Sequence, residues 1–171
     1  QQIDRENVDQ LELKWVLQNQ VFGAWQSNPI IVDGIMYVTE RPNSVMAVDA
    51  VTGRVFWKYR HQNADNALVC CGANNRGVAV LNDKVYMGTL DAHLIALDRI
   101  NGQVLWKAEV GDVNRAYSVT MAPLAVKDKI MVGVGGGEFG IRGYVAAFDA
   151  ETGEQAWKTY TIPAPGEPNH D

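Results

Sequence analysis

Short runs in which apolar and polar residues alternate recur along the chain, and turn-forming residues separate them. Three runs share one pattern: Ala, an apolar residue, Asp, two variable residues, Thr or Asn, Gly, three variable residues and Trp. The copies are Ala47–Trp57, Ala96–Trp106 and Ala147–Trp157, and successive copies begin about fifty residues apart. A repeat of this length predicts copies of one supersecondary unit packed side by side.

Each copy predicts a β-hairpin. The alternation on either side of the turn indicates half-buried strands, and the TG or NG pair supplies a tight turn in which Gly takes a positive φ. The Asp side chain can accept hydrogen bonds from the amides of that turn. A second hairpin is predicted upstream of each copy, where DG, ND or KD separates β-branched runs, at Pro29–Thr39, Gly77–Thr89 and Ala122–Val134.

Four strands in about fifty residues are typical of β-propeller blades, so we expect an all-β fold. The predicted blades lie near residues 26–60, 75–110 and 120–160 of a partial propeller domain spanning 1–171. The run LELKW predicts a further strand near 11–17 that closes another blade. Three blades and a strand cannot close a ring, which needs about four to eight blades, so we expect a fragment or an associating chain. The repeat predicts blade-packing roles for Trp15, Trp57, Trp106 and Trp157.

Composition narrows the classes of partner. The chain has 171 residues, 47% of them hydrophobic and 20% charged, as in ordinary globular proteins. Its formal net charge of −5 and its singly scattered Lys and Arg argue against binding nucleic acid or an anionic membrane. No apolar run approaches the roughly 20 residues of a membrane helix. The start resembles no signal peptide and lacks Met, which favours a processed or truncated chain.

The only two cysteines, Cys70 and Cys71, are adjacent. A disulfide between them would close a cramped ring through the intervening peptide and add no loop-closure stability, so its use would be local. Two reduced, buried cysteines at a strand end are the more usual state of such a pair. The residues alone leave both states open.

Two further stretches carry candidate chemistry. Residues 133–143 hold three successive glycines followed by Glu138, a hard oxygen donor suited to Ca²⁺-like cations, although a solvated Glu in such a loop is equally common. Arg76 can bind a carboxylate with its planar fork, or remain a solvated surface charge. Because equivalent loops of successive blades gather at one end of a propeller, we expect one site from Cys70, Cys71, Arg76, Thr120 and Glu138.

The three histidines carry no such signal. His61, His93 and His170 have no spacing typical of metal ligands. We therefore expect them in loops or on strand surfaces.

From about Val8 to His170 the sequence resembles the quinoprotein alcohol dehydrogenases, whose large subunit is an eight-bladed propeller that binds pyrroloquinoline quinone (PQQ). The resemblance rests on the three Trp-ended repeats together with CCGANNRGVAV, VYMGTLDAHLIALD and GGGEFGIRGYVAAFDAETG. The combination is much more specific than any one of these motifs.

The resemblance implies a role for each candidate residue. Cys70 and Cys71 would form a vicinal disulfide over one face of the quinone, and Arg76 would contact the carboxylates of the cofactor. Thr120 and Gly136 would contact the cofactor, and Glu138 would ligate a Ca²⁺ or lanthanide ion bound to it.

The sequence also departs from the family pattern. Gln26 stands near the cofactor where many relatives have Glu, and Gly135 and Gly137 replace a Ser and an Ala. The family's catalytic Asp base, its metal-binding Asn and the Trp on the opposite quinone face lie beyond residue 171. We therefore expect this fragment alone to be inactive.

The resemblance implies part of a periplasmic enzyme that oxidises a primary alcohol by hydride transfer to PQQ, with the metal as Lewis acid, and passes electrons to a cytochrome c. A disulfide would suit an oxidising compartment. The remainder of the propeller chain is the other implied partner, and a homodimer is allowed. The alternative is a cofactor-free propeller that acts as a protein-binding scaffold, which has no need of Cys70, Cys71 or Glu138.

Overall fold

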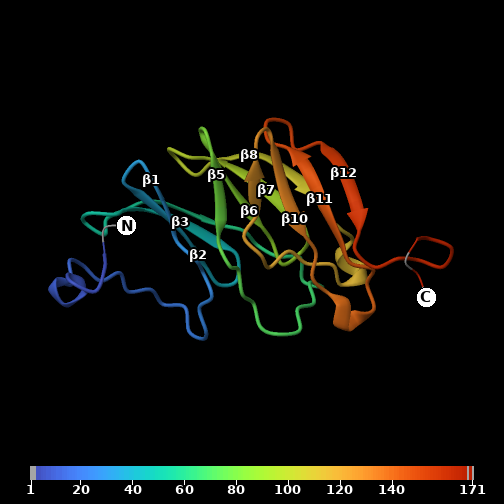
Figure 1. Ribbon diagram of the computed structural model, residues 1–171, viewed down its shortest axis with the longest axis horizontal. Coiled ribbons are helices and arrows are strands. Elements are labelled where there is room, and N and C mark those ends of the chain that lie inside the picture. The colour runs from blue at the N-terminus through green and yellow to red at the C-terminus, as the bar shows by residue number, and fades with distance from the viewer. Residues whose placement is uncertain (1–2, 169, 171) are drawn as a thin grey trace.

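Three four-stranded antiparallel sheets lie side by side in the computed structural model, which describes residues 3–168 and 170 (Figure 1). Each sheet is formed by four consecutive strands, paired in chain order. The first sheet comprises β1 (Ile30–Val32), β2 (Ile35–Glu40), β3 (Ser44–Asp49) and β4 (Val55–Arg60). The second comprises β5 (Val78–Leu81), β6 (Lys84–Gly88), β7 (His93–Asp98) and β8 (Val104–Glu109). The third comprises β9 (Leu124–Val126), β10 (Lys129–Gly133), β11 (Tyr144–Asp149) and β12 (Gln155–Tyr160). The predicted all-β, propeller-blade architecture is confirmed.

The turn that closes each repeat is held by its aspartate. Asp49 Oδ1 accepts hydrogen bonds from the backbone N–H groups of Val51, at 2.8 Å, and Thr52, at 3.0 Å. Asp98 and Asp149 make the same pair of bonds in their own turns. The backbone hydrogen bonds, led by that from Thr52, hold the pKa of Asp49 below its ordinary value.

The tryptophan that ends a repeat packs on the turn of the next sheet. Nε1 of Trp57 donates to the carbonyl of Arg99 at 3.0 Å, and Nε1 of Trp106 donates to that of Ala150 at 3.1 Å. A Cβ on Gly102, at φ +72°, would lie 2.5 Å from the Trp57 ring. Only glycine allows this close approach, so the Trp of one repeat and the Gly of the next form a single contact between blades.

The strand predicted near 11–17, which was expected to close another blade, stays a prediction. A strand requires hydrogen bonds to a neighbouring strand, and none of the described residues pairs with this segment. Trp15 still makes the contact expected of a blade-packing residue, because its Nε1 donates to the carbonyl of Ala50 at 3.1 Å. Its ring lies 2.7 Å from where a Cβ on Gly53 would be. Trp15 therefore occupies the place of a repeat Trp, although its segment forms no backbone pairing with a described strand.

The hydrophobic core lies between neighbouring sheets. Buried side chains of the first and second sheets form one cluster, which includes Tyr37, Val45, Val85 and Leu97. Side chains of the second and third sheets form another, which includes Tyr86, Leu94, Ile130 and Phe148. On the outer strand β12, by contrast, every residue is exposed, and Trp157 retains 40% of its accessible surface. The described residues therefore give Trp157 no blade to pack on.

Helical structure among the described residues is limited to three single turns, η1 (Val8–Gln10), η2 (Val113–Arg115) and η3 (Gly137–Phe139). None of these turns has the length to cross a membrane. The turn η3 lies in the connection between β10 and β11. Figure 1 shows this connection (orange) at the same edge of the molecule as the connection between β4 and β5 (green).

Candidate functional site

A cavity of about 220 Å³ opens where three connections meet. The β4–β5 connection, the segment before β9 and the β10–β11 connection each supply part of its lining. The cavity brings together Cys70, Cys71, Arg76, Thr120, Gly136 and Glu138, with Ser118 and Asn74 among its other lining residues. Gln26 is exposed and does not line the cavity, so its predicted cofactor contact stays a prediction.

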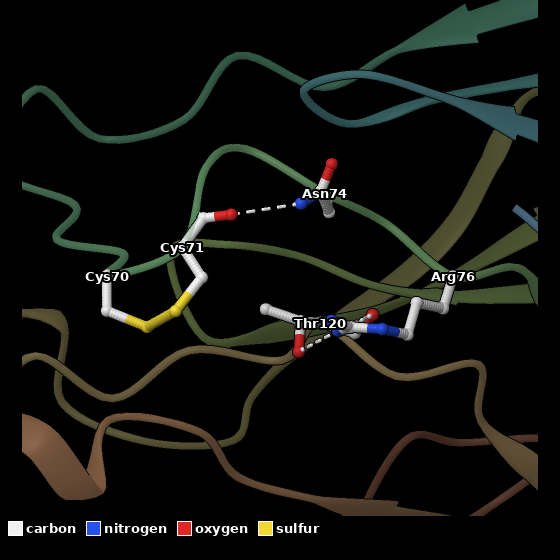
Figure 2. The surroundings of a disulfide bond; sticks show 5 residues. All are labelled: Cys70, Cys71, Asn74, Arg76 and Thr120. Carbon is white, nitrogen blue, oxygen red and sulfur yellow. Dashed lines mark hydrogen bonds between the residues drawn. A yellow bond between two sulfur atoms is a disulfide. The ribbon is translucent and has the colours of Figure 1, made fainter. Parts of the chain in front are cut away.

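The adjacent cysteines are joined by a disulfide. Both residues are exposed, so the alternative of two reduced, buried cysteines is wrong. Asn74 fixes the loop behind them, because its Nδ2 donates to the carbonyl of Cys71 at 3.1 Å (Figure 2). Both cysteines line the cavity, and as a disulfide they offer no thiolate to a metal.

Arg76 is fixed by two elements of the chain. Its backbone N–H donates to the carbonyl of Thr120 at 3.1 Å, and its own carbonyl accepts from the backbone N–H of Asn28 at the same distance. The guanidinium also binds this threonine, because Nη1 donates to Thr120 Oγ1 at 2.8 Å (Figure 2). A permanent, oriented positive charge therefore lies on the cavity wall, suited to an anionic ligand.

The glycines of the β10–β11 connection let it run close against the neighbouring segment. Ser118 and Gly135 exchange backbone hydrogen bonds of 3.1 and 2.8 Å. Gly136 has φ +121°, and a Cβ there would lie 2.2 Å from the carbonyl oxygen of Ala116. The chain then turns through η3, which carries Glu138. Glycine at 136 is therefore a steric requirement of the path that delivers this carboxylate.

The Glu138 carboxylate is exposed and makes no hydrogen bond or ion pair with the residues that the structure describes. One of its oxygens and the sulfurs of Cys70 and Cys71 lie within 4.8 Å of one another. An unpaired carboxylate is a hard donor for Ca²⁺ or a lanthanide ion, and the nearby guanidinium suits carboxylates on a ligand. The lining therefore fits an anionic, metal-bound cofactor that has one face against the disulfide.

A second group of polar residues was not anticipated from the sequence. His61 was expected in a loop or on a strand surface. It lies in the connection after β4, but its side chain is only 7% exposed and its Nε2 lies 2.9 and 3.0 Å from the two oxygens of Asp91. His93 Nδ1 lies 3.4 Å from Asp91 Oδ1. The expected loop position holds for His61 but its burial was not expected, and it arises because stacking of the blades places the end of β4 beside the β6–β7 turn. Spacing along the chain carries no sign of this contact.

Asp91 is almost completely buried, and its surroundings hold it ionised. Burial alone would raise the pKa of this carboxyl, but hydrogen bonds from Thr89 Oγ1, at 2.5 Å, and from His61 outweigh burial. The backbone N–H of Ala64 also donates to Asp91, at 3.2 Å. The pKa of Asp91 therefore lies well below its ordinary value.

Comparison with known proteins gives a consistent result. The family described as glucose/ethanol/alcohol dehydrogenase, β-propeller domain, with the short name PQQ, matches residues 1–171. The quinohemoprotein alcohol dehydrogenase ADH-IIG of Pseudomonas putida is 46% identical over 168 residues, which cover 95% of this chain and 23% of that protein. The lanthanide-dependent methanol dehydrogenase of Methylacidiphilum fumariolicum is 41% identical over 165 residues, covering 94% and 27%.

Among solved structures, the quinohemoprotein alcohol dehydrogenase from Comamonas testosteroni superposes with a TM-score of 0.87 at 39% identity. The match covers 98% of this chain and 26% of that one. The chain thus spans about a quarter of the length of the relatives it matches.

Proposed function

Because the chain belongs to the PQQ family of glucose, ethanol and alcohol dehydrogenases, we propose that it forms one side of the cofactor site of a PQQ-dependent alcohol dehydrogenase. The observation that carries the proposal is the cavity at which the Cys70–Cys71 disulfide, Arg76 and Glu138 meet. A cofactor-free scaffold would have no use for them together.

Each residue has a separate task in this proposal. The disulfide would cover one face of the quinone ring and exclude water from it. Arg76, held by Thr120, binds a carboxylate of the cofactor, and Glu138 supplies an oxygen ligand to Ca²⁺ or a lanthanide ion. When bound, PQQ would supply the hydride acceptor for alcohol oxidation, and the metal ion held by Glu138 would supply a Lewis acid.

The proposal extends to the whole protein. Its substrate is a primary alcohol, and a cytochrome c receives the electrons. The names of the relatives support this extension, since they include quinohemoprotein alcohol dehydrogenases and the dehydrogenase subunit of a quinone-linked enzyme. An exposed disulfide persists in an oxidising compartment, which favours the periplasm. The remaining catalytic groups come from the rest of the propeller.

The proposal is tested by reconstituting the intact protein with PQQ and either Ca²⁺ or a lanthanide ion. We expect alcohol-dependent reduction of an electron-accepting dye, lost on Glu138→Gln, which keeps the side-chain shape but removes the charged ligand. Glu154→Gln is the matched control, because Glu154 is an exposed residue of the β11–β12 turn, outside the cavity lining. Absence of quinone binding, or full metal-dependent activity in Glu138→Gln, would show the proposal to be wrong.

A further inference from the structure

The cluster of His61, Asp91 and His93 offers three ligand atoms of the types that transition metals prefer. One nitrogen of each imidazole and one oxygen of the carboxylate lie within 4.8 Å of one another. None of the three residues lines the cavity that holds Glu138, so the cluster is separate from the candidate cofactor site.

The spacing of these atoms is close to that of a first coordination shell. Ligand atoms about 2.0 Å from a tetrahedral zinc ion lie about 3.3 Å from one another. In the structure, His61 Nε2 lies 2.9 Å and His93 Nδ1 lies 3.4 Å from Asp91 Oδ1. Both distances to Asp91 Oδ1 are therefore within a few tenths of an ångström of that spacing, and the two imidazole nitrogens lie within 4.8 Å of each other.

His93 is the member of the cluster that the fold leaves unsatisfied. Its Nδ1 is buried, yet it has no hydrogen-bond partner within residues 3–168 and 170, because the contact with Asp91 lacks hydrogen-bond geometry. A buried polar atom without a partner costs free energy, and bonding to a metal ion would remove that cost. The His93 side chain is still 23% exposed, which leaves a path for an ion and a place for a water ligand.

The carboxylate is oriented from behind, as metal-binding carboxylates usually are. Thr89 Oγ1 and the backbone N–H of Ala64 donate to its two oxygens, at 2.5 and 3.2 Å. Such supporting hydrogen bonds fix a ligand's direction and its charge state. The donor in the His61 contact is Nε2–H, since an ionised carboxylate only accepts, and a metal ion would replace that proton.

We propose that His61, Asp91 and His93 form a binding site for a divalent transition-metal ion such as Zn²⁺. Two imidazoles and one carboxylate, with a position open to water, form a donor set that suits Zn²⁺ and its neighbours better than Ca²⁺. The site joins the end of β4 to the turn before β7, so a bound ion links the first sheet to the second.

The test is calorimetric titration of the intact, EDTA-treated protein with Zn²⁺. We expect the wild type to bind one Zn²⁺ at this site, and His93→Ala to lower the affinity at least tenfold or abolish binding. His93→Gln should show the same loss while keeping a polar side chain of similar length. We also expect His93→Gln to retain the melting temperature of the metal-free wild type, since Nδ1 gives up no hydrogen bond.

Two controls separate this site from other binding. His170→Ala removes the remaining histidine of this chain, which is exposed and outside the cluster, and should bind Zn²⁺ as the wild type does. Glu138→Gln should also retain the site, so failure of the proposed cofactor site and failure of this one give different results. Absence of Zn²⁺ binding in the wild type, or unchanged affinity in both His93 variants, overturns the proposal and leaves the cluster as an ion pair between blades.

Discussion

The β6–β7 turn and the β10–β11 connection occupy the same place in successive repeats, and each presents a carboxylate, but the two carboxylates differ in every respect. Asp91 in the first is 3% exposed and accepts hydrogen bonds from Thr89, His61 and Ala64. Glu138 in the second is exposed and unpaired among the described residues.

The length of the connection explains the difference. Four residues separate β6 from β7, so Asp91 must turn into the protein and contact the neighbouring blade. Ten residues separate β10 from β11, and they include η3, which carries Glu138 away from the sheets toward the disulfide. The short β6–β7 connection therefore joins two blades, whereas the longer β10–β11 connection can present its carboxylate to a ligand.

Of the changes that test this difference, Asp91→Ala should have the largest effect on stability. The substitution removes a buried charge and leaves Thr89, His61 and the Ala64 amide without their acceptor, so we expect a loss of about 3 to 5 kcal/mol in the free energy of unfolding. Urea unfolding of the intact protein at pH 7 with EDTA present measures this without any metal contribution. Asp65→Ala, at an exposed aspartate of the β4–β5 connection, is the control and should change stability by less than about 0.5 kcal/mol. Equal effects of the two changes would show that Asp91 does not join the blades.

Gly136→Ala should have the next largest effect. The new Cβ would meet the Ala116 carbonyl at 2.2 Å on backbone at φ +121°, and we expect a cost of about 2 to 3 kcal/mol. Gly137→Ala is a matched neighbour, because a Cβ there meets no atom within 4 Å and its φ is ordinary. The melting temperatures of the two variants should therefore differ clearly. If they were equal, the close approach would not fix the path of the β10–β11 connection.

The fold could be predicted from the sequence because its signals are local and repeated. The Asp and Gly of each turn and the alternation of apolar residues recur three times, so each copy supports the others. The strand near 11–17 was predicted on the same local pattern and stays a prediction, because its pairing depends on a neighbouring strand that the described residues do not supply. Trp15 shows that side-chain packing can follow the repeat even where backbone pairing does not.

The candidate site was predictable only in part. Equivalent loops of a propeller converge, so Cys70, Arg76 and Glu138 could be predicted to lie together. The disulfide between the cysteines could be predicted only from the resemblance to a family. The contact of His61 with Asp91 joins residues thirty positions apart, and no motif marks it. Such contacts depend on how blades stack, which local patterns do not encode.

Acid should lower the free energy of unfolding, partly through protonation of Asp91. Its pKa is lowered in the folded state, so its stabilising contribution is fully present above the ordinary value of 3.8 and is lost as the pH falls toward the folded pKa. Within that window the contribution falls by about 1.4 kcal/mol per pH unit. We expect the stability difference between wild type and Asp91→Asn, from urea unfolding at pH 2.5 to 6, to shrink below about pH 4. A difference that does not vary with pH would rule out this linkage.

The smallest effect on stability is expected from Glu138→Ala. The carboxylate is exposed and has no partner among the described residues, so its removal should change the free energy of unfolding of the metal-free protein by less than about 0.5 kcal/mol. Activity should behave in the opposite way, because the proposed metal ligand is lost, and we expect a decrease of about 100-fold or more in alcohol oxidation. Urea unfolding of the apoprotein and dye-coupled assays of the reconstituted protein measure the two quantities separately. A large loss of stability with little loss of activity would assign Glu138 the structural role that Asp91 has in the preceding blade.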